Sequence, residues 1–229
     1  MKRTDAWPAL AALASTQHGL VTSAQAVELG LSRPQLGRFV EAGYLSHVER
    51  GLYLLAGRNA GEWFEQRVAW VQLAPKLTVE QRIRAGDPVG VFSHESAAWL
   101  LGLGTVAAWQ HEITITAGSR VVVREDCVLH ESSEPITRDE WWLREGLPVT
   151  RPEITVRDLA AAGIDGDHLA VIVRDALVKY ADHPRTYESI LAPYAAAYFC
   201  SDGADFLREC VVTAGVSPVS AYLGRTVAA

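Results

Sequence analysis

The stretch that decides the fold of the N-terminal region is Ser32-Arg33-Pro34-Gln35-Leu36-Gly37-Arg38-Phe39-Val40-Glu41. Leu36, Phe39 and Val40 recur at the i, i+3 and i+4 spacing of one helix face, so the sequence predicts a short amphipathic helix whose apolar side packs inward. The remaining positions carry guanidinium and amide groups, which are the groups that read base edges in DNA. The stretch therefore predicts a DNA-reading helix.

Two capping signals define a pair of short helices around this stretch. Thr22 followed by Gln25, and Ser32 followed by Gln35, each fit a capping box, in which hydroxyl and amide groups satisfy backbone donors of the first helical turn. Gly30 can adopt the positive φ that ends the first of the two helices. The sequence thus predicts two helices joined by a tight turn, which is a helix-turn-helix.

The flanking residues complete a small domain. An apolar stripe of helical period predicts a first helix over residues 6–17. Residues 44–48 and 52–55 predict two short strands joined by the polar turn Glu49-Arg50-Gly51. Because a hairpin directly after a recognition helix is a wing, we expect residues 1–57 to form a winged helix-turn-helix DNA-binding domain.

The rest of the chain predicts a second domain of mixed composition. Its expected start at residue 62 follows residues 57–61, which lack periodicity and contain two glycines. Strands are expected at 111–116, 120–124, 127–131 and within 141–149, and helices at 62–73, 93–101 and almost throughout after residue 150. Thr150 and Glu153 fit a third capping box. The expected fold class is α+β, with a winged helix-turn-helix at 1–57 followed by a mixed α+β domain at 62–229 that has a helical C-terminal part.

The charge of the 229-residue chain is uneven. The formal net charge of −6 argues against nucleic-acid binding, because phosphate contacts supply much of the affinity for DNA. Through residue 60, however, there are six basic and four acidic residues, against fifteen basic and twenty-three acidic residues in the remainder. This asymmetry favours a DNA-binding module joined to an acidic domain that has a different partner.

Targeting signals and disulfide patterns are not evident. No apolar run approaches the length of a membrane-spanning helix and no signal-peptide core follows the first residues, so we expect a cytoplasmic protein without a membrane partner. Cys127, Cys200 and Cys210 are odd in number and lack C-x-x-C spacing, which argues against a disulfide framework or a thiolate zinc site. We expect them to be reduced and partly buried.

Three His-Glu pairs raise the question of a metal or catalytic site: His94-Glu95, His111-Glu112 and His130-Glu131. No H-E-x-x-H motif is present, and Ser93-His94 lacks the G-x-S-x-G context of a nucleophile. None of the three lysines follows an acid by two residues, as the E-x-K element of metal-dependent nucleases requires. We therefore predict no enzyme, no catalytic residue, no metal and no cofactor, and expect His94 to hydrogen-bond within the fold.

The candidate DNA contacts lie on the predicted recognition helix, at the wing tip and at the N-terminus: Ser32, Arg33, Gln35, Arg38, Arg50, Lys2 and Arg3. Arg33 and Arg38 are the principal candidates, since arginine binds guanine edges or phosphates. Ser32 and Gln35 could contact phosphate and adenine, but a capping role alone would explain both. Arg50 could reach a flanking phosphate or the minor groove, although hairpin tips often carry arginine for solubility alone. Lys2 and Arg3 could form an arm, although chain termini are usually disordered.

Several segments resemble, in the same order, the AbiEi antitoxins of bacterial type IV toxin-antitoxin systems. Residues 17–22, 26–32, 43–45 and 50–53 resemble the N-terminal winged helix of that family, residues 92–103 resemble its Ser-His-x-Ser-Ala-Ala helix, and residues 146–152 and 155–160 resemble a later segment. The resemblance covers about residues 10 to 180. Ile154 departs from it, standing where the family pattern has an arginine.

The resemblance implies a function. It implies a protein that binds inverted repeats in its own promoter through the winged helix, represses transcription, and counteracts a nucleotidyltransferase-like toxin encoded alongside. Palindromic sites would place two protomers on the DNA. Two alternatives stay open: an interaction module that blocks the toxin directly, with DNA binding secondary, and a ligand-responsive transcriptional regulator. The sequence does not identify the residues that would contact a toxin.

Overall fold

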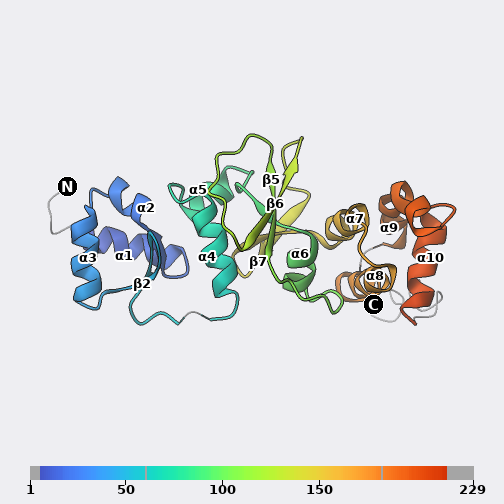
Figure 1. The fold of residues 1–229 in the computed structure, drawn as a ribbon, viewed down its shortest axis with the longest axis horizontal. Helices are drawn as coiled ribbons and strands as arrows, with labels where there is room; N and C mark the ends of the chain where they lie inside the picture. Colours follow the sequence, from blue (N-terminus) through green and yellow to red (C-terminus); the bar gives the residue numbers. More distant parts are fainter. Residues whose placement is uncertain (1–5, 60, 182, 216–229) are drawn as a thin grey trace. The chain divides into compact units, whose positions relative to one another are not determined.

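The computed structural model describes residues 6–59, 61–181 and 183–215. The chain divides into two compact units. Their helices and strands are labelled in Figure 1. The first consists of Met1–Gly90, Ile115–Cys127 and Glu131–Thr137, and the second of Val91–Thr114, Val128–His130 and Arg138–Ala229. The division into functional domains at residues 57–62 stays a prediction. None of the described helices is long and apolar enough to cross a bilayer.

The N-terminal region combines three helices with a small sheet. The helices are α1 (Ala6–Thr16), α2 (Ser23–Glu28) and α3 (Arg33–Glu41), and the strands are β1 (Leu20–Thr22), β2 (Leu45–Glu49) and β3 (Leu52–Leu55). The strands pair antiparallel in the order β1-β3-β2. The predicted first helix, the helix-turn-helix and the following hairpin are all present.

Local capping explains where α2 and α3 begin. The Thr22 hydroxyl accepts a hydrogen bond from the Gln25 backbone N–H at 3.1 Å, and Gln25 Oε1 accepts one from the Thr22 N–H at 3.0 Å. Gly30 ends the turn after α2 with a φ of +79°, which a residue without Cβ adopts freely. At the start of α3, the backbone N–H and the hydroxyl of Ser32 both donate to Gln35 Oε1 at 2.8 Å.

The apolar face of α3 packs into the core of this region. Leu36 is fully buried and clusters with Leu10 of α1, Val21 of β1 and Leu45 of β2. An aromatic group covers one side of the cluster: the ring of Trp7 lies 4.8 Å from that of Phe39 and 5.1 Å from that of Tyr44, between centroids. The face of α3 that carries Arg38 is therefore left to solvent.

Two buried amides join the helix pair to the next part of the first unit. Gln17 and Gln25 donate to each other's Oε1 at 3.0 and 3.1 Å, and both are at most 2% exposed. Gln25 Nε2 also donates to the Leu77 carbonyl at 2.8 Å, and the Val79 N–H donates to Gln17 Oε1 at 2.9 Å. These bonds link the helix pair to α5 (Val79–Arg84), which follows α4 (Phe64–Leu73).

A mixed sheet and a set of helices form most of the second unit. The sheet has the order β6-β5-β4-β8-β7, built from β4 (Val91–Phe92), β5 (His111–Thr116), β6 (Cys127–Ser132), β7 (Trp141–Arg144) and β8 (Leu147–Thr150). β4 runs parallel to β8 and antiparallel to β5, and β7 runs antiparallel to β8. The helix α6 (His94–Leu101) leaves β4 and ends at Gly102, whose φ is +65°.

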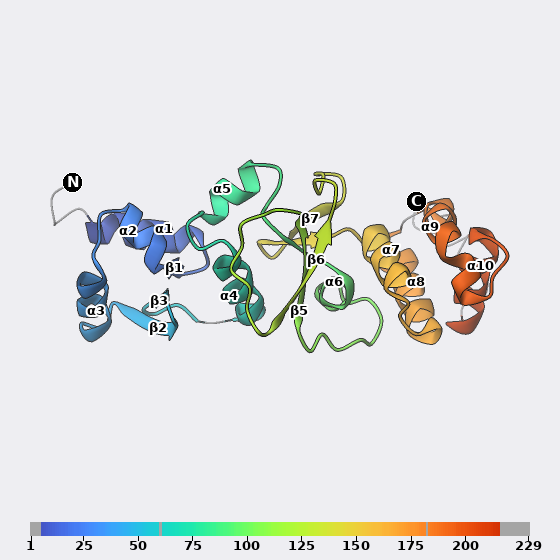
Figure 2. The same ribbon diagram turned by 45° about the horizontal axis from the view of Figure 1, so that its top comes forward.

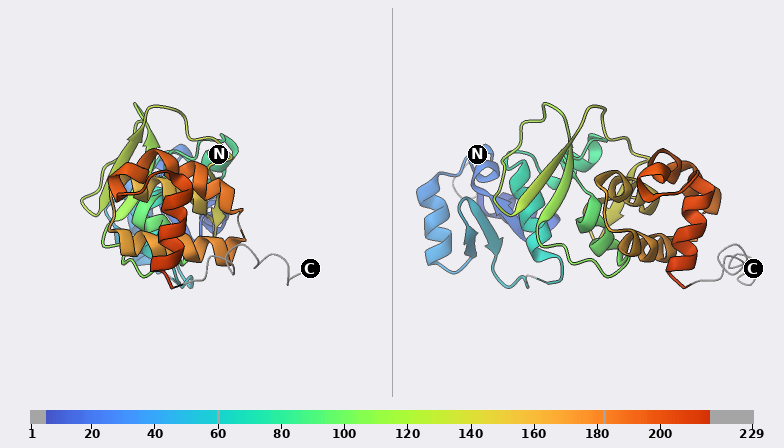
Figure 3. Two further views of the ribbon diagram at one scale, coloured as in Figure 1. Left: turned by 90° about the vertical axis from the view of Figure 1, so that its right-hand side faces the viewer. Right: turned by 45° about the vertical axis from the view of Figure 1, so that its right-hand side comes forward.

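The C-terminal part of the described chain is helical, as predicted. It consists of α7 (Pro152–Ala162), α8 (Gly166–Tyr180), α9 (Pro184–Leu191), a 3₁₀ segment η1 (Ala192–Tyr198) and α10 (Gly203–Thr213). Helix α10 packs on both α8 and α9, and α7 contacts both α8 and α9. Figures 2 and 3 show this group from further sides. The fold is therefore α+β, with N-terminal helices and strands and a helical C-terminal part.

Of three local expectations, two were wrong and one, at residues 141–149, was incomplete. Residues 120–124 form a loop and no strand: the Val122 N–H donates to the Leu73 carbonyl of α4 at 2.9 Å instead of to a neighbouring strand. Residues 141–149 form two strands, because Glu145 and Gly146 both have positive φ and turn the chain into a hairpin. The third capping box is absent, since Thr150 ends β8 and its hydroxyl lies 2.7 Å from that of Thr155.

Candidate nucleic-acid interface

The structure exposes the principal candidates for DNA contact. Arg33 and Arg38 lie on α3 with exposed side chains, and Arg50 is exposed in the turn between β2 and β3. Gly51 beside it has a φ of +78°, which gives this turn its tight form. Lys2 and Arg3 lie outside the described residues. The arginines are thus carried by two rigid elements, a helix and a hairpin.

Arg33 and Arg38 do not share one face of α3. Five residues of an α-helix correspond to a rotation of about 140°, so the two side chains point in different directions. Arg38 lies on the side opposite Leu36, which faces the core. Arg33 lies nearer the hairpin and lines a groove together with Arg50 and His47. Within α3, Arg38 therefore faces outward and Arg33 faces the wing.

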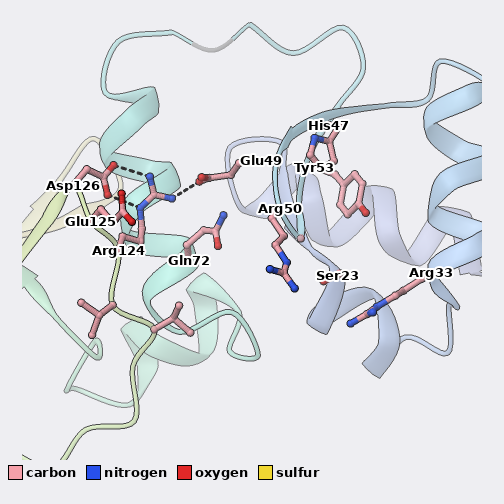
Figure 4. Close-up of a pocket in the computed structure, with 13 residues that line it drawn as sticks. Ser23, Arg33, His47, Glu49, Arg50, Tyr53, Gln72, Arg124, Glu125 and Asp126 are labelled. Atoms are coloured by element: carbon pink, nitrogen blue, oxygen red, sulfur yellow. Dashed lines mark hydrogen bonds and ion pairs between the residues drawn. The ribbon is translucent and has the colours of Figure 1, made fainter.

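The groove beside the wing has a volume of about 1250 Å³ and is formed entirely by the first unit. Its walls come from the start of α3, the β2–β3 hairpin, Gln72 of α4 and residues 122–126. Figure 4 shows the guanidinium groups of Arg33 and Arg50 on one side of the groove and the carboxylates of Glu125 and Asp126 on the other. The two sides therefore differ in charge.

Arg124 pairs with two carboxylates on the acidic side of the groove. It forms an ion pair with Glu49 of the wing, and its Nε and Nη2 donate to the two carboxylate oxygens of Asp126 at 2.8 and 2.7 Å (Figure 4). The hydrogen bond with Asp126 is the main cause that raises the pKa of Arg124 above its ordinary value. Because its charge is already matched by two carboxylates, Arg124 is a poor candidate for a phosphate contact.

The capping geometry limits what Ser32 and Gln35 can do. Gln35 Oε1 already accepts two hydrogen bonds from Ser32. Reading adenine in the major groove requires a glutamine to present both its carbonyl oxygen and its amide group. Gln35 would therefore have to release the cap of α3 before it could read a base in this way. Their direct contact with DNA stays a prediction.

Gly37 is a feature of α3 that the sequence analysis did not use. It lies in the helix interior, where glycine costs roughly 1 kcal/mol relative to alanine. It is exposed, and a Cβ built on it would meet no described atom within 4 Å. The interior of the protein therefore does not require a glycine here. A partner surface that approaches the helix backbone closely would explain it, and the propensity cost was the signal that could have drawn attention to it.

A second polar cluster lies in the second unit. His94 at the start of α6, Glu112 on β5 and His130 on β6 are half-buried and bring their ligand atoms within 4.8 Å of one another. Burial, followed by the proximity of His130, lowers the pKa of His94 to about 4. Burial acts to raise the pKa of Glu112, but hydrogen bonds from His130 and the Glu95 N–H outweigh it, so this pKa is lowered. The expectation that His94 hydrogen-bonds within the fold is confirmed, since its Nδ1 lies 2.9 Å from Ser93 Oγ.

The first unit thus contains a helix-turn-helix with a hairpin after it and exposed arginines on both. Residues 8–56, which cover this arrangement, match the family model described as "Transcriptional regulator, AbiEi antitoxin". The match confirms the resemblance for the N-terminal region. It supports a role as an antitoxin or transcriptional regulator, which is non-enzymatic in kind.

The whole fold has a relative among solved structures. It is similar to the crystal structure of the RV2827C protein from Mycobacterium tuberculosis, with a TM-score of 0.51 and 16% sequence identity over 96% of this chain and 80% of that chain. At this identity the likeness concerns the fold alone. No curated protein sequence matches the chain.

Proposed function

We propose that this chain is an antitoxin that binds its own promoter through a winged helix-turn-helix, represses transcription from it, and counteracts a nucleotidyltransferase-like toxin. The observation that carries the proposal is the family match over residues 8–56, which coincides with the helix-turn-helix and hairpin that expose Arg33, Arg38 and Arg50. The uneven distribution of charge supports it, because the basic residues prevail only in this part of the chain.

In this proposal α3 enters a major groove. Arg38, on the outward side of α3, contacts base edges or the phosphates that line the groove. Arg33 and Arg50, which line one side of the groove beside the wing, receive the phosphate backbone that runs next to the major groove. Inverted repeats in the promoter place a second protomer on the neighbouring half-site.

Binding to the DNA immediately upstream of the gene tests the proposal. We expect the double variant Arg33→Ala/Arg38→Ala to bind this fragment at least ~30-fold more weakly, since each well-formed arginine contact contributes about 1–3 kcal/mol. Arg84→Ala is the matched control: Arg84 is an exposed arginine of the same unit, paired with Glu80 on α5 at 2.7 Å. Fluorescence anisotropy at one fixed salt concentration measures both. Equal affinities of a folded double variant and the wild type would refute the role of α3.

A direct block of the toxin is the second candidate function. The excess of eight acidic residues after residue 60 favours it, because such a surface complements a basic nucleotide-binding cleft. Co-expression with the product of the adjacent gene distinguishes the two modes. A stable complex that survives purification indicates direct neutralisation. If no complex forms but the promoter is repressed, the antitoxin acts by limiting transcription of the toxin gene.

A further inference from the structure

The three His-Glu pairs of the sequence each contribute one residue to a single cluster. His94 comes from the first pair, Glu112 from the second and His130 from the third, and their ligand atoms all lie within 4.8 Å of one another. His130 Nε2 and Glu112 Oε1 are 3.1 Å apart. The three residues belong to the second unit and come from a helix start and two strands.

We propose that His94, Glu112 and His130 together bind one divalent transition-metal ion, for which zinc is the best match. Two imidazoles and one carboxylate are a ligand set that zinc accepts, with a water or another donor in the fourth position. Metal–ligand bonds of about 2.0–2.1 Å in a tetrahedron place the ligand atoms about 3.3 Å apart. The His130–Glu112 pair is already close to this separation. The His94 ring must turn out of its stack with His130 before one of its nitrogens points at the same ion, because an imidazole binds a metal in its ring plane.

The side chains that would hold the ion are oriented by hydrogen bonds from outside the cluster. The fully buried Ser93 places its hydroxyl 2.9 Å from His94 Nδ1 and accepts a hydrogen bond from the Thr114 hydroxyl at 2.8 Å. The backbone N–H of Glu95 donates to Glu112 Oε2 at 2.7 Å, so this carboxylate keeps Oε1 directed at His130. Such outer partners fix the orientation of metal ligands and are a regular part of metal sites.

Two further features set His94 apart within the cluster. Its ring stacks on that of His130, with centroids 3.7 Å apart and planes 16° from parallel. His94 also has a φ of +50°, a backbone region that non-glycine residues seldom occupy and that is frequent at functional sites.

One nearby cation must be considered. Arg157 of α7 is close enough to lower the pKa of His94 through its charge. It is, however, paired with Asp158 at 2.9 Å and with Glu140 at 3.2 Å. Two carboxylates therefore offset its charge, and it leaves the local field compatible with a bound dication.

Zinc titration of the full-length, untagged chain tests the proposal. After treatment with a chelator and its removal, calorimetry should show one zinc ion bound per chain, and zinc should raise the midpoint of thermal unfolding because it binds the folded state. We expect Glu112→Gln and His130→Gln each to lower the affinity at least ~10-fold. His168→Gln is the matched control: His168 is an exposed histidine of the same unit, and its replacement should leave the affinity unchanged.

A second measurement keeps the test decisive where a variant does not fold. In the wild-type chain, zinc should shift the imidazole resonances of His94 and His130 in NMR spectra and leave those of His168 in place. Cobalt(II) in place of zinc should give the visible absorption of a four-coordinate site. The proposal is overturned if the wild type binds no stoichiometric zinc, if the shifted resonances belong to other histidines, or if folded Glu112→Gln and His130→Gln bind zinc as the wild type does.

Discussion

The α3–wing surface and the His94–Glu112–His130 cluster are both polar, but they are built in opposite ways. Arg33, Arg38 and Arg50 extend from rigid elements into solvent. The residues of the cluster are half-buried and contact one another across three elements. The difference teaches where function and stability are coupled. Exposed arginines can be replaced at little cost in folding, whereas each change in the cluster alters the packing of groups that depend on one another.

The largest expected effect concerns the salt dependence of the exposed surface. If three arginines contact phosphates, raising the salt concentration from 50 to 200 mM should weaken DNA binding roughly 40-fold, because log K falls with log salt at a slope of about −0.9 per contact. The slope should become less steep by about 0.9 for each arginine that is removed and contacts a phosphate. Anisotropy titrations of Arg33→Ala and Arg38→Ala measure this. An unchanged slope with lower affinity for Arg38→Ala would instead assign this residue to a base edge.

The next effect concerns how the free energy of unfolding depends on pH through the half-buried His94–Glu112–His130 cluster. The folded pKa of His94 is about 4, below the ordinary value of 6.5, so between these values the unfolded chain binds a proton that the folded chain does not. The free energy of unfolding of the metal-free protein should therefore fall as the pH is lowered from 7 to 5, by roughly 1 kcal/mol after allowance for partial exposure. Urea unfolding at the two pH values measures it.

His94→Asn is the variant that isolates this titration. Asparagine tolerates the positive φ of this position better than most residues and does not titrate in this range, so the variant should lose less stability on acidification than the wild type. Arg38→Ala is the comparison from the exposed surface and should show the same pH dependence as the wild type. A His94→Asn variant that loses as much stability as the wild type would show that other groups control the acid response.

The smallest effect concerns Gly37. Because a Cβ at this position meets no described atom, Gly37→Ala should raise the free energy of unfolding by about 0.5–1 kcal/mol through its higher helix propensity. If α3 docks closely on DNA, the same variant should bind the promoter fragment more weakly. Urea unfolding and anisotropy on one preparation measure both. Higher stability with unchanged DNA affinity would show that the partner does not approach the backbone at Gly37.

The sequence predicted the N-terminal region well because its signals are local. Capping pairs three residues apart, a glycine that allows positive φ, and a helical apolar stripe act within one or two turns of chain. The errors arose where an element depends on distant residues. Residues 120–124 have the composition of a strand but lie against α4, and Thr150 fits a capping box but ends a strand and contacts Thr155.

In the candidate site, too, the features set by near neighbours could be predicted and those set by distant residues could not. Exposure of Arg33, Arg38 and Arg50 could be predicted because charged residues opposite an apolar stripe face solvent. The separate directions of Arg33 and Arg38 follow from helix geometry, but the groove beside the wing does not. One wall of the groove is formed by residues 122–126, which are far from the wing in the sequence. The ion pair between Arg124 and Glu49 joins this wall to the wing.

By itself, the sequence determined the helix-turn-helix, its hairpin and its outward arginines, since backbone hydrogen bonds and helical periodicity operate between near neighbours. Only the tertiary structure decided that the three His-Glu pairs meet, and which residue of each pair enters the cluster. The strand order β6-β5-β4 and the alternation of side chains along β5 and β6 bring Glu112 and His130 together beside His94, whereas the ring of His111 on β5 lies against Phe92. No spacing in the sequence encodes that meeting, because it depends on which strands become neighbours in the sheet.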